Sequence, residues 1–139
     1  MAAVQSNLSA YLEASSRLPW VWGERDCALW VANFVLSIRG TDPGATWRGK
    51  YRTRLGCERL LKNQGGLAQV MSLGAAACGL PSVDTASTGN VGVIMAPVMR
   101  RGKISLEHTG AIKTATGWAH FTANGIVVFQ AKAVAAWSL

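Results

Sequence analysis

Three residues have side chains that together suit thiol chemistry: Cys27, His108 and His120. A cysteine attacks a carbonyl carbon as its thiolate, so thiol-based acyl transfer needs a base that accepts the thiol proton. A histidine is the usual base near neutral pH, and a second polar residue can hold its imidazole in the required tautomer. We therefore expect Cys27 to be a nucleophile that works with a histidine.

Cys27 lies at the start of an expected helix. From Cys27 to Ile38, apolar residues recur at intervals of three and four, which is typical of one buried helical face. Asp26 is the expected N-cap, and Gly40 is the expected C-cap. A helix N-terminus presents free N–H groups and a partial positive charge. We therefore expect the pKa of the Cys27 thiol to fall below its usual ~8.5, with N–H donors available for an oxyanion.

The two histidines flank an expected turn at residues 113–117, and they are 12 positions apart. In a hairpin centred near Thr114, His108 and His120 would lie directly opposite each other, with Cβ atoms about 5 Å apart on one face. One would serve as the general base and the other would orient it. The sequence alone does not show that this face of the hairpin contacts Cys27.

The other cysteines, Cys57 and Cys78, show no base nearby in the pattern, and we expect both to be small core residues. Three cysteines at wide spacing do not indicate a disulfide framework. The sequence contains no zinc-ligand spacing and no phosphate-binding glycine motif. We therefore expect no metal and no cofactor.

The pattern changes from helical to β near Pro81, which favours an α+β fold. We expect helices over residues 7–16, 26–38, 52–63 and 67–77, and strands over residues 90–98, 103–112, 118–123 and 126–130. Residues 133–139 fit either a strand or a helical turn. The first strand is a nearly continuous apolar run, which indicates an internal position in an antiparallel sheet.

The composition is that of a folded chain: of 139 residues, 50% are hydrophobic and 15% are charged. We expect a single domain over residues 1–139 and no membrane span, since no apolar run approaches the ~18 residues that a span needs. Residues 1–9 lack the basic start and apolar run of a secretory signal. If the protein acts outside the cell that makes it, something else must carry it there.

Most of the net charge of +7 comes from the segment between Arg39 and Lys62, which contains seven Lys and Arg residues and only two acidic residues, Asp42 and Glu58. This basic segment is either a solvated surface or a site for an anionic partner, such as a cell-wall polymer, a membrane surface or an acidic neighbouring subunit. Nucleic acid is the partner we favour least, because the segment has few interleaved aromatic residues and matches no nucleic-acid motif.

Several segments resemble the NlpC-type peptidases, which are papain-like cysteine peptidases that cleave bacterial cell-wall peptides. Residues 20–23 (Trp-Val-Trp-Gly) followed by Asp26-Cys27 resemble the family's aromatic-x-x-Gly…Asp-Cys segment. Residues 108–112 (His-Thr-Gly-Ala-Ile) resemble its His-Val-Gly-Ile-Tyr strand, residues 118–120 (Trp-Ala-His) its aromatic-x-His, and residues 88–91 (Thr-Gly-Asn-Val) its Gly-Asp-Leu/Val strand start.

This resemblance implies a papain-like NlpC-type fold in which the helix of Cys27 packs on the antiparallel sheet. It implies that Cys27, His108 and His120 are catalytic. Trp20, Trp22 and Asp26 are the expected substrate-binding residues. The two indoles precede Cys27 in an extended stretch, and either one of them lines an apolar substrate groove or both cap the core.

The closest resemblance is to a compact phage and prophage branch of the family, encoded among tail-tip genes. It implies a virion-associated peptidase that cleaves peptidoglycan stem peptides, located in the phage tail, or in the host cytoplasm before assembly. The expected partners are peptidoglycan peptides and other tail proteins, contacted through residues 133–139 or the basic segment. The alternative is a structural tail-tip component with the same fold and little or no activity. Departures from the family pattern at Trp20, Ala28-Leu29 and Asn90 favour the alternative.

Overall fold

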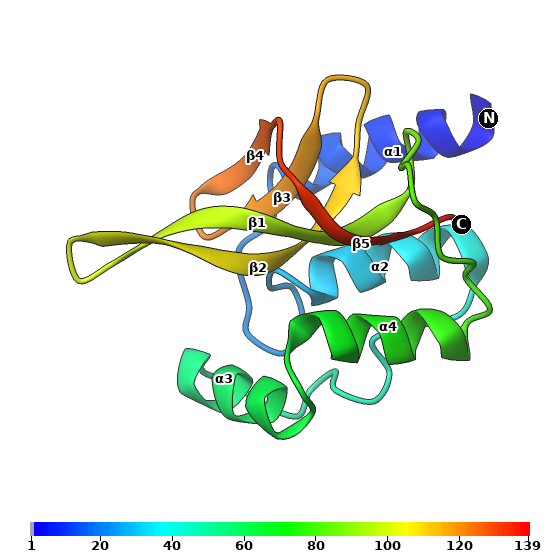
Figure 1. Ribbon diagram of the computed structural model, residues 1–139. Coiled ribbons are helices and arrows are strands. Elements are labelled where there is room, and N and C mark those ends of the chain that lie inside the picture. The colour runs from blue at the N-terminus through cyan, green and yellow to red at the C-terminus, as the bar shows by residue number, and fades with distance from the viewer. Residues whose placement is uncertain (1) are drawn as a thin grey trace.

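The computed structural model describes residues 2–139, and in this range four helices precede a five-stranded antiparallel sheet (Figure 1). The helices are α1 (Ala2–Ser15), α2 (Leu29–Arg39), α3 (Arg54–Asn63) and α4 (Leu67–Ala77). The strands are β1 (Val91–Arg100), β2 (Lys103–Lys113), β3 (Trp118–Thr122), β4 (Gly125–Phe129) and β5 (Ala133–Trp137). The predicted α+β class is confirmed.

Helix α2 begins two residues later than predicted, with Ala28 and not Asp26 in the N-cap position, and it ends at the predicted Gly40. Asp26 Oδ1 accepts hydrogen bonds from the N–H groups of Ala28 at 3.2 Å and Leu29 at 3.1 Å, and its carbonyl accepts from Trp30 at 2.9 Å. At the other end, Gly40 adopts the left-handed conformation with φ +74°. This conformation is open to a glycine without a steric penalty, so the helix stops there.

The strand order in the sheet is β4-β3-β2-β1-β5. Strand β1 therefore lies between two neighbours, as its apolar run predicts. The open question of residues 133–139 is settled in favour of a strand, because β5 pairs antiparallel with β1 and places Trp137 beside Val91.

The two faces of the sheet belong to different hydrophobic clusters. We call one the α2 face, because it shares a hydrophobic cluster with the buried side of α2; its members include Val91, Val93, Ile112, Ala119 and Phe121. The opposite face, here called the outer face, has a smaller cluster that consists of Ile94, Ala96, Ala111, Trp118 and Ala136. Figure 1 shows α2 and α4 together on one side of the sheet.

Strands β1 and β2 extend together far beyond the rest of the sheet (Figure 1). Strand β3 pairs with β2 only at Ile112 and Lys113, and β5 pairs with β1 only from Val91 to Ile94. The two long strands remain paired with each other up to Arg100 and Lys103. We call this projection, residues 96–107, the arm.

Within residues 2–139, no helix has both the length and the apolar character that crossing a membrane requires.

Candidate functional site

The start of α2 touches strand β2 at Gly110. A Cβ atom on Gly110 would lie 2.7 Å from the carbonyl oxygen of Cys27 and 3.0 Å from Val31 Cγ2, so a side chain there would have no space. The backbone of the Cys27 turn therefore rests directly on the strand that carries His108. This close approach is the structural basis of the candidate site.

Asp26 is buried beside this contact, and its hydrogen bonds join three segments of the chain. The residue is 0% exposed, and its carboxylate also accepts hydrogen bonds from the Gly23 N–H at 3.0 Å and the Tyr51 hydroxyl at 2.6 Å. Both of its oxygens are thus occupied by protein donors, as a buried carboxylate requires. This position contradicts the predicted contact between Asp26 and a substrate.

The thiol of Cys27 is held in its neutral form. Burial, together with the charges of Asp26 and the neighbouring Cys57, raises the pKa of the thiol to about 12, and hydrogen bonds with the Thr109 side chain and the Ala28 backbone only partly oppose this rise. The expected decrease in pKa is therefore wrong. The main physical reason is the burial of the thiol, which disfavours its charged form. The second is that the Asp26 carboxylate, and not the thiolate, accepts the N–H groups at the start of α2.

The hairpin between β2 and β3 has a different register from the predicted one. Ile112 pairs with Ala119 and Lys113 with Trp118, so continuing the ladder by one residue places Ala111, not His108, opposite His120. Alternation along β2 places His108 on the α2 face with Gly110, whereas His120 shares the outer face with Trp118. The prediction that the two histidines face each other is therefore wrong.

The two histidines also differ in environment. His120 is 8% exposed and packs edge-on against Phe129, with ring centroids 5.6 Å apart. Burial lowers its pKa below the usual value, which keeps the imidazole neutral. His108 is exposed and pairs with Met95 across the β1–β2 ladder. Among the described residues, no hydrogen bond joins His108 to the Cys27 thiol, whose partner on β2 is Thr109.

Trp20 and Trp22 begin the segment that leads to Cys27. The Trp20 indole stacks on Phe121 of β3 at 5.8 Å and meets Trp22 edge-on at 5.0 Å, and Trp22 in turn packs against Tyr51 at 6.5 Å. Both indoles are half-buried, so they pack against the core and still expose part of their surface. Their contact with a substrate stays a prediction.

Sequence reasoning missed the contributions of Tyr51, Cys57 and Thr109. Tyr51 donates to Asp26 across 25 residues of sequence, and its hydroxyl also meets the buried Cys57 thiol, whose pKa burial raises to about 11. No local pattern could have indicated these long-range contacts. The core role predicted for Cys57 agrees with its burial, and Cys78 is half-buried.

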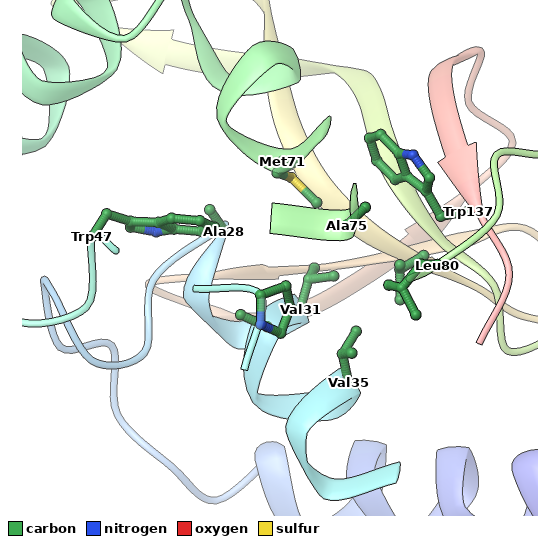
Figure 2. Close-up of a pocket in the computed structure, with 11 residues that line it drawn as sticks. Ala28, Val31, Val35, Trp47, Met71, Ala75, Leu80 and Trp137 are labelled. Atoms are coloured by element: carbon green, nitrogen blue, oxygen red, sulfur yellow. The ribbon is translucent and has the colours of Figure 1, made fainter. Parts of the chain in front are cut away.

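An apolar cavity lies near the site but does not contain its chemistry (Figure 2). It is lined by residues of α2, α4 and β5 and of the loops beside them, and its wall includes Ala28, Val31, Met71, Leu80 and Trp137. Neither Cys27 nor a histidine lines it. The cavity is therefore a gap in core packing and not a reaction chamber.

A comparison with protein families finds one matching description, "Domain of unknown function (DUF6950)", over residues 1–139. No curated protein and no solved structure matches the chain.

Proposed function

The chain belongs to the DUF6950 family, and we propose that it is a phage tail-tip cysteine peptidase of NlpC-type, papain-like fold that cleaves peptidoglycan stem peptides. The observation that carries the proposal is the contact between the Cys27 turn and Gly110. His108 lies two residues before Gly110 on the same face of β2, so the candidate nucleophile and base belong to two backbones in direct contact.

In the proposed reaction, Cys27 Sγ gives its proton to the His108 imidazole as it attacks the carbonyl carbon of a peptide bond. The imidazolium then protonates the leaving amine, and water hydrolyses the thioester that remains on Cys27. Because the resting thiol is neutral, the base must approach it during the reaction. The imidazole of His108 is exposed and can move toward the thiol. His120 projects from the opposite face of the sheet, and we assign it no part in proton transfer.

The alternative is a structural tail-tip component that keeps this fold without turnover. Two observations favour it. The Asp26 carboxylate occupies the N–H groups that an oxyanion would use, and burial keeps the Cys27 thiol protonated. Both features are compatible with a folded protein that presents a surface to other proteins.

A zymogram on purified bacterial cell walls tests the proposal. We expect clearing by the wild type, loss of clearing in Cys27→Ala and in His108→Gln, and retained clearing in His120→Gln. The matched control is Cys78→Ala, which removes a half-buried thiol at the end of α4. Circular dichroism confirms that each variant is folded.

Clearing that survives Cys27→Ala, or a folded wild type that releases no stem peptide, would contradict the peptidase. In the second case, an assay of phage assembly tests the structural alternative: phage particles that carry Cys27→Ala should assemble normally. Particles that lack the protein altogether should fail to assemble if it is a structural component.

A further inference from the structure

The arm carries a row of apolar side chains that the rest of the protein leaves uncovered. Met99, Ile104 and Leu106 are 63%, 69% and 64% exposed, respectively. These are among the most exposed large hydrophobic residues of the part of the chain that the structure describes. An apolar group of this size on a projecting hairpin is typical of an interaction surface.

The register of the arm brings these side chains together on one face. Pro97 pairs with Leu106, and Met99 pairs with Ile104, at alternate positions of the β1–β2 ladder. Cross-strand partners at alternate positions point to the same side of a sheet. The four side chains therefore form one continuous stripe, here called the arm stripe.

The arm also offers unused backbone hydrogen-bonding groups. Strand β3 pairs with β2 only at Ile112 and Lys113, so the outward edge of β2 from Lys103 to Gly110 has no neighbouring strand. An exposed strand edge beside apolar side chains is a template for pairing with another strand. The geometry thus suits an extended polypeptide.

The charge on α3 and on the face of the arm opposite the arm stripe selects the kind of polypeptide. Arg100 bridges the arm to α3, since it pairs with Glu58 at 2.9 Å and with Glu107 at 2.6 Å. The arm and α3 thereby form one surface, which contains six Lys and Arg residues and only these two glutamates. Such a surface attracts an acidic partner and repels a second copy of this chain.

We propose that the arm binds an acidic, extended segment of another protein, which adds as a strand to the open edge of β2 and covers the arm stripe. A lipid surface fits less well, because the open strand edge would lose its water partners in hydrocarbon without gaining others. Nucleic acid would leave the arm stripe uncovered. Neither Cys27 nor His108 takes part, so the proposal stands apart from the peptidase.

The test uses a fluorescently labelled peptide of alternating valine and glutamate and follows its anisotropy with the full chain. We expect the double variant Ile104→Ser/Leu106→Ser to bind about tenfold more weakly than the wild type, a change of about 1.4 kcal/mol. The matched control is Leu73→Ser, which changes another exposed leucine, on α4 and 54% exposed, and this variant should bind as the wild type does. Hydrogen exchange should show protection of residues 103–107 when the peptide is bound.

Absence of wild-type binding at roughly 1 mM peptide, the upper end of weak affinities, would overturn the proposal. So would equal binding of a valine–lysine peptide, or equal weakening by Leu73→Ser. Binding of phosphatidylglycerol vesicles or duplex DNA that depends on Ile104 and Leu106, without peptide binding, would reassign the arm to that partner. Self-association in sedimentation that the double variant abolishes would reassign it to a second copy.

Discussion

At the scale of single residues, the site is governed by competition for the N-terminus of α2. A buried carboxylate carries a full charge and needs donors, whereas a cysteine can remain neutral without them. Asp26 therefore takes the N–H groups of Ala28 and Leu29, and the proton stays on Cys27. The same aspartate that caps the helix thus opposes ionisation of the adjacent thiol.

Alkylation by iodoacetamide tests this arrangement. Because the pKa of the Cys27 thiol is raised to about 12, its modification should accelerate about tenfold per pH unit between about pH 7 and pH 9, across the ordinary thiol pKa of ~8.5, without a plateau. Peptide mapping by mass spectrometry gives the rate for each cysteine, and guanidinium-unfolded protein is the control. A plateau for Cys27 below the ordinary thiol pKa would instead indicate a thiolate paired with His108.

His120 should make the protein less stable in acid. Its pKa is lowered in the folded state, so the contribution of the neutral imidazole is complete above the unfolded value of ~6.5 and is lost as the pH falls below it. Urea denaturation at about pH 7.5 and pH 5.5, on either side of that value, should show a loss of stability that His120→Gln reduces. His108→Gln, at an exposed position, should leave the loss unchanged.

At the scale of elements, the turn between β2 and β3 has a different centre from the predicted one, and this difference places the two histidines on opposite faces of the sheet. Thr114 N–H donates to the Gly117 carbonyl at 2.7 Å, and Thr114 Oγ1 accepts from the Gly117 N–H at 3.1 Å, so the turn is centred after Thr114. A change in the centre of a turn changes every pair of the hairpin, and an odd offset moves a side chain to the other face. His120 consequently lies on the outer face.

Gly110 tests the contact between α2 and β2. We expect Gly110→Ala to lower the free energy of unfolding by about 1–3 kcal/mol, because the added methyl group would overlap the Cys27 carbonyl and no open space adjoins it. Urea denaturation measures the change. Ser105→Ala on the exposed part of the same strand is the control and should change it by less than about 0.5 kcal/mol. Equal effects of the two substitutions would show that the contact is not tight.

At the scale of the whole molecule, the C-terminal strand closes the fold. Strand β5 covers one edge of β1, Trp137 is 6% exposed, and the backbone of Val83 donates to Ala136. Residues 133–139 are one of the two segments that the sequence suggested for contact with another protein. In the structure, the indole of Trp137 packs within the chain itself. The arm and the basic segment, by contrast, remain available.

Loss of β5 should therefore unfold the protein and not merely weaken assembly. We expect Trp137→Ala to cost about 3–5 kcal/mol, as for other buried aromatic residues, and a chain that ends at Lys132 to lose its cooperative thermal transition in circular dichroism. Val134→Ala, at a residue 46% exposed, is the control and should change stability little. A truncated chain that melts cooperatively would contradict a structural role for β5.

The sequence by itself determined the elements, because local signals mark them. The helix predicted over residues 67–77 has the same bounds as α4, and Gly40 ends α2 as expected, since glycine allows the left-handed turn that stops a helix. Apolar runs and turn residues likewise located the strands to within a few residues and thereby indicated the α+β class.

Only the tertiary structure decided how those elements meet at the site. The contact of Cys27 with Gly110, the bond from Tyr51 to Asp26 and the register that separates His108 from His120 all join residues by packing across the chain. Residue type and spacing leave such geometry open, because a thiol, a carboxylate and an imidazole change their protonation with their surroundings. The sequence therefore named the reactive side chains, and the packing around them determined their charge and the face on which each one lies.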